Sequence, residues 1–196
     1  GLCRYVEYED RFDVFRPQTG DPGSLPHNVI TSLALDPHNR LIIGSGSGIS
    51  IFSADRRRFT NIPLTAGSGA VTFVLDTFVD SKSRIWVGTR DQGLFLLDQN
   101  GDVVRHYRAS PGHPGALQSD MVKSIEEDPF GRIWVGTYGG GVSRLNEGER
   151  DFTTYLADPA DPYAIGSNTI WAIFLDSADV LWLSTDQGGL ARYQED

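Results

Sequence analysis

The sequence predicts an all-β protein made of repeated small antiparallel sheets. Three observations indicate this: an internal repeat, apolar segments rich in β-branched and aromatic residues, and turn residues between those segments. The chain has 196 residues, of which 22 are glycine and 10 are proline, so it can form many short turns. Four short strands in each repeat of roughly 40–50 residues are typical of β-propeller blades. We therefore predict propeller blades of four antiparallel strands, in about four repeats.

The repeat is anchored on tryptophan. Trp86, Trp134 and Trp182 follow one another at intervals of 48 residues, and the first copy has Ile42 at the same place. Each anchor lies in a short segment such as IWVGT, whose apolar residues on both faces are typical of a strand buried on both sides. A fourth tryptophan, Trp171, lies in the apolar run that opens the last copy. We expect the tryptophans to be core anchors, with Trp171 set apart by its place in an innermost strand.

Turns separate the apolar segments in a fixed order. Asp36 and Asp128 begin the turns DPHN and DPFG, in which Asp, then Pro, then a fourth-position Asn or Gly favour a type I turn. The strand after the Asp turn carries Gly88 in the copy of Trp86 and Gly136 in the copy of Trp134. A glycine-containing connection suited to a hairpin comes next. We predict structural roles for these aspartates, glycines and tryptophan anchors. The recurring segments LPHN, LQSD and IGSN in the longer connections are also expected to be scaffold.

The chain is expected to begin and end within a blade. The N-terminal segment GLCRYVEY is similar to GGLARYQED near the C-terminus, and FDVFR supplies the last strand of that first partial blade. Within one propeller region, 1–196, we place a partial blade at 1–28, repeats at 29–69, 70–119 and 120–167, and a second partial blade at 168–196. Because the first residue is glycine rather than methionine, we expect the chain to be part of a longer protein.

Two arrangements of these blades are open. The N-terminal strand could pair with the C-terminal strands and close a small four-bladed ring, which would remove free sheet edges. Alternatively, the chain is an arc of a larger propeller, and its exposed edges would then favour a homodimer through blade edges. The sequence does not decide between the ring and the arc.

Composition and spacing argue against several partners. The net charge of −9 disfavours nucleic acid and anionic membrane surfaces, and no stretch approaches the roughly 18 apolar residues of a membrane span. The histidines do not have metal-ligand spacing, and no G-x-S-x-G nucleophile motif is present. We therefore expect no metal, no cofactor, no nucleic acid partner and no membrane contact by this part of the protein.

The segment from Val122 to Leu145, VKSIEEDPFGRIWVGTYGGGVSRL, resembles the two-component regulator propeller repeat. The copies around Trp86 and Trp182 resemble it less fully, and the copy around Ile42 resembles it least. The resemblance implies an extracytoplasmic sensor region of a membrane-bound hybrid histidine kinase or diguanylate cyclase. It further implies a periplasmic or extracellular location, in a protein of the inner membrane. The motif of the family is structural, so no ligand residue is carried over.

Strand polarity suggests where a ligand would bind. In a four-stranded antiparallel blade, the connections between the second and third strands emerge on the same face as the connections between blades. The Asp turns on the opposite face are uniform, whereas the second-to-third connections vary in sequence, as binding loops on a rigid scaffold do. We predict that Arg90, Asp91, Tyr138 and Asp186 lie near one mouth and bind a ligand.

The leading functional interpretation is a non-catalytic module that senses a small molecule, such as a carbohydrate. An enzyme on a propeller scaffold, such as a lyase or a glycosidase, is the alternative. A glycosidase would need paired carboxylates at one mouth, for which Asp91 and Asp186 are the candidates. A purely structural or dimerising element is a third interpretation, because one fold can support any of these functions.

Overall fold

The computed structural model describes residues 1–66, 69–70 and 73–193, and its regular structure is almost entirely β-strand. Three four-stranded antiparallel sheets follow one another along the chain. They are blade A, with β3 (Ile30–Leu35), β4 (Leu41–Ser45), β5 (Gly48–Phe52) and β6 (Phe59–Ile62); blade B, with β9 (Val74–Val79), β10 (Ile85–Thr89), β11 (Leu94–Leu97) and β12 (Val103–Tyr107); and blade C, with β13 (Val122–Glu127), β14 (Ile133–Thr137), β15 (Val142–Leu145) and β16 (Phe152–Tyr155). The predicted all-β class and the four-stranded blades are confirmed.

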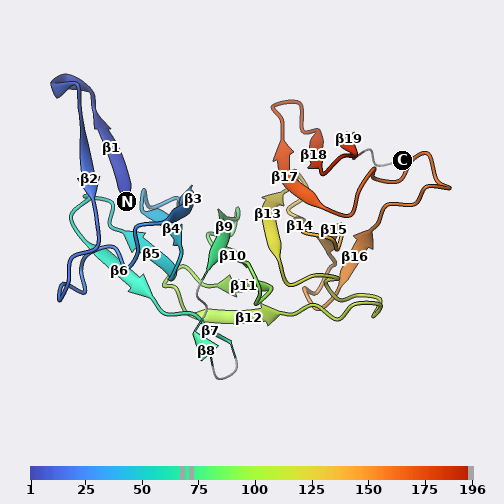
Figure 1. Ribbon diagram of the computed structural model, residues 1–196, viewed down its shortest axis with the longest axis horizontal. Coiled ribbons are helices and arrows are strands. Elements are labelled where there is room, and N and C mark those ends of the chain that lie inside the picture. The colour runs from blue at the N-terminus through green and yellow to red at the C-terminus, as the bar shows by residue number, and fades with distance from the viewer. Residues whose placement is uncertain (67–68, 71–72, 194–196) are drawn as a thin grey trace.

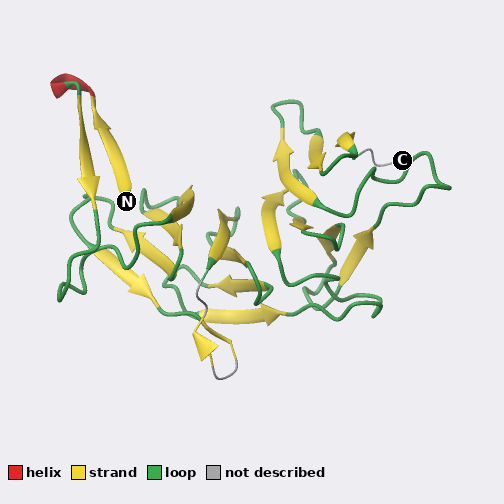
Figure 2. Ribbon diagram, viewed as in Figure 1, coloured by secondary structure: helices red, strands yellow, loops and turns green. Residues whose placement is uncertain are grey.

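Smaller sheets lie before, between and after these blades. They are the hairpin of β1 (Leu2–Val6) and β2 (Arg11–Phe15), the hairpin of β7 (Thr65–Ala66) and β8 (Gly69–Ala70), and the three-stranded blade D of β17 (Ile170–Leu175), β18 (Leu181–Thr185) and β19 (Gly189–Arg192). Figure 2 shows strands joined by loops throughout, with one helical turn, η1 (Glu7–Glu9), at the tip of the first hairpin. Within the described residues, no helix is long and apolar enough to cross a membrane.

The blades form an open arc. In Figure 1 the innermost strands β3, β9, β13 and β17 follow the concave side, and β6, β12 and β16 lie on the outer side. The N-terminal hairpin and blade D lie at opposite ends of this arc. The strand β1 pairs with β2, and blade D is a separate sheet, so the two ends of the chain do not close a ring. Of the two arrangements that the sequence leaves open, the closed ring and the arc, the structure shows the arc.

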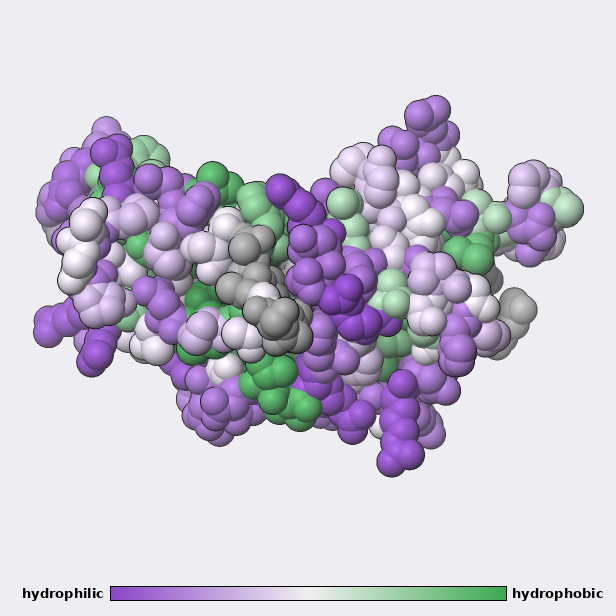
Figure 3. Space-filling model, turned by 60° about the horizontal axis from the view of Figure 1, so that its bottom comes forward, coloured by the Kyte–Doolittle hydropathy of each residue, from purple (hydrophilic) through white to green (hydrophobic). Residues whose placement is uncertain are grey.

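A core layer lies between each pair of neighbouring blades. The layers join Ile42 and Ile49 of blade A to Val87 and Phe95 of blade B, Trp86 and Leu94 of blade B to Ile125 and Val135 of blade C, and Trp134 and Val142 of blade C to Ile170 and Leu183 of blade D. Because successive side chains of a strand point to opposite faces, a middle strand such as β10 supplies both of its neighbouring layers. This explains why the IWVGT segments are apolar on both faces. The outer face in Figure 3 is mainly hydrophilic, with apolar side chains in small patches.

The Asp turns fold through a set of local hydrogen bonds. Asp128 Oδ1 accepts the backbone N–H groups of Phe130 and Arg132, both at 3.0 Å. Asp128 Oδ2 accepts the side-chain N–H groups of Arg132 at 2.6 Å and of Trp134 at 2.8 Å. Each turn therefore fixes the start of the next strand and the orientation of its tryptophan. In blade A, where Ile42 replaces the tryptophan, Asp36 keeps the corresponding bonds to its turn.

Glycine in the second strand allows neighbouring blades to approach closely. A Cβ atom added at Gly88 would lie 2.6 Å from Cγ1 of Val122, and one added at Gly136 would lie 2.7 Å from Cγ2 of Ile170. Both distances are too short for real carbon atoms, so no larger residue fits without movement of the next blade. The two glycines are therefore required by packing between blades.

Side chains also join the innermost strands of adjacent blades. Ser32 Oγ lies 3.0 Å from Thr77 Oγ1, between blades A and B. Asp76 Oδ2 accepts the N–H of Ile125 at 2.8 Å, between blades B and C, and Ser124 Oγ accepts the N–H of Ile173 at 2.9 Å, between blades C and D. The last two bonds satisfy backbone N–H groups on the edges of the sheets, which would otherwise need water. We call this row of contacts the inner seam.

Candidate functional site

One rim of the arc carries the turns between second and third strands. The first residue of each turn donates its backbone N–H to the residue just before the innermost strand of the same blade. These bonds run from Arg90 to Phe73 O at 3.0 Å, from Tyr138 to Met121 O at 2.9 Å, and from Asp186 to Thr169 O at 2.9 Å. The three residues thus occupy equivalent places on blades B, C and D.

A β-bulge in the innermost strand adds a side chain near this rim. The pairing of β17 with β18 passes from Ile170 opposite Thr185 to Ala172 opposite Ser184, which leaves Trp171 as the extra residue. A bulge bends its strand and redirects a side chain. Trp171 is 45% exposed, so the expectation that it is a core anchor is wrong.

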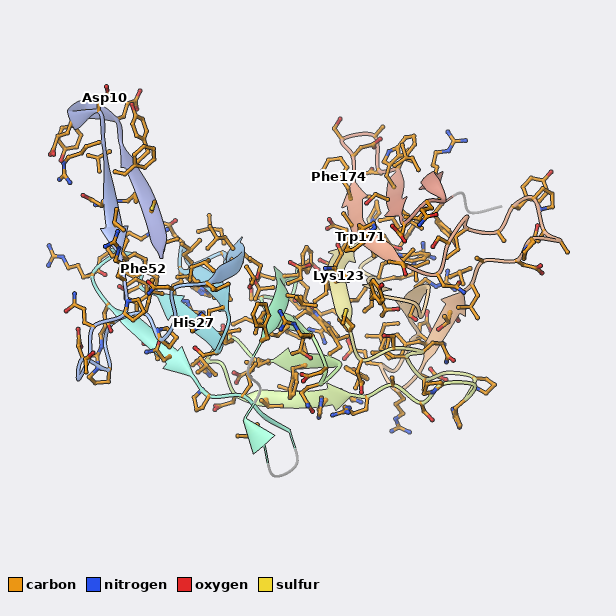
Figure 4. The ribbon with its side chains drawn as sticks, viewed as in Figure 1. Asp10, His27, Phe52, Lys123, Trp171 and Phe174 are labelled. Carbon is orange, nitrogen blue, oxygen red and sulfur yellow. The ribbon has the colours of Figure 1, made fainter. Side chains whose placement is uncertain are left out.

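Blade C has its bulge at the same position. The pairing of β13 with β14 passes from Val122 opposite Thr137 to Ser124 opposite Gly136, which leaves Lys123 as the extra residue. The two bulges thus present a lysine and a tryptophan on adjacent blades. Figure 4 shows Lys123 and Trp171 next to each other at the concave side of the arc.

Four side chains form a rim cluster: Lys123, Tyr138, Trp171 and Asp186. The ammonium nitrogen of Lys123 lies 4.8 Å from the centre of the Trp171 ring. The Tyr138 ring meets the Trp171 ring edge-on, with 6.1 Å between the ring centres, and the indole N–H of Trp171 donates to Asp186 Oδ1 at 3.4 Å. Trp171 is thus held by three polar or aromatic neighbours, although nearly half of it faces solvent.

The structure places the four residues predicted from sequence in two groups. Tyr138 and Asp186 meet through Trp171 in the rim cluster. The guanidinium of Arg90 instead lies on the ring of Phe73, 3.6 Å from its centre. Asp91 is exposed in the same turn as Arg90, and among the described residues its side chain makes no hydrogen bond or ion pair.

Two members of the cluster, Lys123 and Trp171, were not predicted from the sequence. They stand at the equivalent place of blades C and D, where blade A has Thr31 and blade B has Leu75. The sequence did contain one signal for this site. This position differs from repeat to repeat, whereas the rest of the strand is regular and apolar. The bulge itself leaves no mark on the sequence, so an exposed tryptophan could not be told from a buried one.

The inner seam contains a carboxyl group with a strongly shifted pKa. Burial raises the pKa of Asp76 to about 6, although the N–H groups of Ile125 and Thr77 oppose the rise, and the negative charge of Glu126 adds to it. Burial also raises the pKa of Glu126, against hydrogen bonds from the backbone of Glu127 and Leu175. Both carboxyl groups accept hydrogen bonds from backbone N–H groups of the next blade, and this role is structural.

The recurring segments of the long connections hold backbone in place. Asp120 Oδ1 accepts the N–H of Ala109, and Asn168 Oδ1 accepts the N–H of Ala157, both at 2.7 Å. These bonds agree with the interpretation of the segments as scaffold. In the part of the chain that the structure describes, no group of three or more His, Cys, Asp or Glu side chains could hold a metal ion.

A hollow of about 1160 Å³ lies elsewhere, between blade C and blade D. Its lining includes Trp134, Tyr155 and Tyr193, and it shares no residue with the rim cluster. The third strand of blade D, β19, has no fourth strand beside it in the described residues, whereas the third strands of blades A, B and C do. The hollow is lined by Ala191 and Arg192 of β19, the strand with a partner on one side only.

Comparison with known proteins identifies the repeat. The two-component regulator propeller family matches residues 116–139 and 164–187, which contain all four members of the rim cluster. No curated protein matches the chain. The extracellular domain of the hybrid two-component system BT4673 from B. thetaiotaomicron is 25% identical, with a TM-score of 0.81 over 100% of this chain and 25% of that one.

Other solved structures agree on the fold. The extracellular domain of the hybrid two-component system BT3049 from B. thetaiotaomicron is 26% identical, with a TM-score of 0.70, over 88% of this chain and 22% of that one. The virginiamycin B lyase of Staphylococcus aureus is 17% identical, with a TM-score of 0.59, over 90% of this chain and 57% of that one, and shares the fold alone. The chain thus spans about a quarter of the length of the two-component extracellular domains that it matches. It is an arc of propeller blades, two segments of which match the two-component regulator propeller family.

Proposed function

We propose that the chain is part of the extracytoplasmic, ligand-sensing propeller of a membrane-bound signalling receptor. The observation that carries this proposal is its likeness, over its whole length, to the extracellular domain of a hybrid two-component system. The same likeness supports a location in the periplasm or outside the cell. Two segments that match the repeat family support the same conclusion.

The rim cluster is the proposed binding site. Its half-exposed indole offers apolar surface, the ammonium group of Lys123 lies over the same ring, and Tyr138 and Asp186 add polar groups beside it. Aromatic faces with a few well-placed polar groups are typical of small-molecule sites. The cluster joins blades C and D, so a ligand there would contact two repeats at once. A small molecule with a flat, partly apolar ring, such as a carbohydrate, suits this surface.

The chemistry of the rim supports binding rather than catalysis. A glycosidase needs two carboxyl groups on either side of the scissile bond. The rim cluster contains one carboxylate, Asp186, and that group accepts the indole N–H of Trp171. The other carboxylate considered, Asp91, belongs to the turn of blade B. In this proposal, Arg90 and Asp91 of the blade B turn would contact a bound ligand only at the border of the site.

A thermal-shift screen against mono- and oligosaccharides tests this proposal. A ligand that binds the native state at about a hundredfold above its Kd should raise the Tm by roughly 5 °C or more. Replacing Trp171 by alanine should abolish the shift, because the platform is lost. The matched control is Phe130→Ala, which removes another exposed aromatic ring, 74% accessible, from an Asp turn. If no sugar shifts the native chain, or if Trp171→Ala binds as well as the native chain, the proposal is wrong.

A further inference from the structure

The cations of the Asp turns and those of the rim differ in their ionic partners. In the Asp turns, the guanidinium groups of Arg40, Arg84 and Arg132 form ion pairs with buried aspartates at 2.6–2.7 Å. At the rim, Lys123 and Arg90 lie on aromatic rings, as Arg84 and Arg132 of the turns also do, but without such an ion pair. Neither rim cation forms an ion pair with any described residue, so the charges at the rim are not neutralised as those of the turns are.

A cation on an aromatic ring keeps its hydrogen-bond donors available. The ring attracts the charge through its electron-rich face and offers no acceptor oxygen. The ammonium group of Lys123 therefore still has N–H donors for a ligand. Lys123 is also partly buried, and less water around it strengthens its attraction to an anion. A carboxylate accepts strong, charge-assisted hydrogen bonds from such a group.

The other side chains of the cluster restrict the rest of the ligand. The exposed part of the Trp171 ring suits the C–H groups of a sugar, and Asp186 beside it can accept a hydrogen bond from a hydroxyl group as well as from the indole N–H. The same aspartate would repel a second negative charge placed next to it. The ligand should therefore carry its anionic group on the Lys123 side of the indole and hydroxyl groups on the Asp186 side.

We propose that the rim cluster binds an acidic sugar, an oligosaccharide in which a ring carries a carboxylate. The ring would rest on Trp171, its carboxylate would accept N–H donors of Lys123, and a hydroxyl group would donate to Asp186. This inference rests on the proposed function and adds the chemical class of the ligand. It does not depend on the identity of the receptor.

The test is a calorimetric titration of the whole chain with pairs of sugars matched in linkage and length. One pair is trigalacturonate and galactotriose, and the other is a glucuronate-containing trisaccharide and its glucose analogue. The acidic member should bind at least about tenfold more tightly, because a charge-assisted bond is stronger than a neutral one. Raising the salt from about 50 to about 300 mM should weaken the acidic member alone, because salt screens charge.

The variant Lys123→Met tests the residue that carries the preference. Methionine keeps an apolar stem on Trp171 but lacks the charge, so the affinity for the acidic sugar should fall about tenfold more than the affinity for the neutral one. The control is Lys82→Met, which changes the only other lysine of the chain, located in an Asp turn. If Lys123→Met still prefers the acidic sugar to the neutral one, the inference is wrong. It is also wrong if the native chain binds the neutral sugars as tightly as the acidic ones or more tightly. Binding of neutral sugars alone leaves the proposed function standing, whereas binding of no sugar overturns both.

Discussion

At the scale of residues, the aspartate of each Asp turn has more partners than its turn alone requires. Asp128 accepts two backbone N–H groups through one oxygen, and the side chains of Arg132 and Trp134 through the other. Asp80 receives the matching bonds from Arg84 and Trp86. Because both oxygens are used, a nearly buried carboxylate is tolerated within the blade. The tryptophan thus orients the turn while it fills the core.

The indole N–H of Trp134 should contribute measurably to stability. We expect Trp134→Phe to lower the free energy of unfolding by about 1–3 kcal/mol, because Asp128 loses a buried donor and the core loses volume. Urea unfolding followed by circular dichroism measures the change. The control is Trp171→Phe, at a half-exposed ring, which should change stability by less than about 1 kcal/mol. Equal losses in the two variants would contradict the role assigned to the hydrogen bond.

How far a residue could be predicted from sequence depends on how far apart its partners lie. The Asp turns and their tryptophans were predictable because their bonds span six residues or fewer. The rim cluster joins Lys123 to Trp171 and Tyr138 to Trp171, across two blades, and it depends on bulges that no motif announces. Strand polarity predicted two members of the rim cluster, Tyr138 and Asp186. It could not show that Arg90 would lie on Phe73 instead.

At the scale of elements, the innermost strands are joined by side chains rather than by a continuous backbone ladder. Asp76 and Ser124 accept N–H groups of the next blade, and the glycines of the second strands let that blade come close. Both devices lie between repeats. A change in one strand should therefore alter the packing of the neighbouring blade.

Gly88→Ala should destabilise the contact between blades B and C. Its new Cβ would lie 2.6 Å from Val122 Cγ1, so a cost of about 1–3 kcal/mol for overpacking is expected in urea unfolding. Gly23→Ala, in a half-exposed turn where the nearest atom is a flexible side-chain oxygen, is the control and should be almost neutral. The double variant Gly88→Ala with Val122→Ala should lose less than the sum of the single losses. Strict additivity would mean that the two residues do not meet.

Asp76 should make the stability of the chain depend on pH. Its pKa of about 6 in the folded chain lies above the value of about 3.9 for an unfolded aspartate, so the folded state binds the proton more tightly. Its contribution to stability is therefore greatest below about pH 4 and falls as the pH rises to about 6, by an amount on the order of 1–3 kcal/mol. Among the strands beside it, β3 and β10 carry no titratable side chain, and β13 carries Lys123, Glu126 and Glu127.

Asp76→Asn isolates this group from the other carboxylates, several of which have lowered pKa values and act in the opposite direction. Relative to that variant, the native chain should be more stable at about pH 4.5 than at about pH 7.5. Urea unfolding of both chains at both pH values gives the difference. A difference that does not change with pH would show that Asp76 does not titrate as expected.

At the scale of the whole molecule, the arc leaves sheet edges and apolar surface at its two ends. The hairpin at the N-terminal end exposes Tyr5, Tyr8 and Phe12, and β19 exposes Leu190. In the described residues, β19 has a sheet partner on one side only. Free strand edges invite pairing with another chain. The repeats predicted the blades, but they could not decide between ring and arc, because that choice depends on the angle between sheets.

The isolated chain should therefore self-associate in a concentration-dependent way. We expect light scattering after size-exclusion chromatography to show dimers or larger species as the concentration rises. A charge on the free strand, as in Leu190→Lys, should shift the chain toward monomer, because charged side chains discourage edge pairing. Phe130→Lys, which places the same charge in an Asp turn, should not. A native chain that stays monomeric at all concentrations would contradict this expectation.

The contact between Gly88 and Val122 has a consequence for how such a protein can grow. The glycine belongs to one repeat and the aliphatic side chain to the next, and the pair recurs as Gly136 with Ile170. Blade C thus has the aliphatic residue of this contact, Val122, on one face and the glycine, Gly136, on the other. A duplicated blade would carry both the glycine and the aliphatic side chain, so it could pack against its neighbours on both sides. Copies could therefore be inserted or lost without any new contact residues between blades.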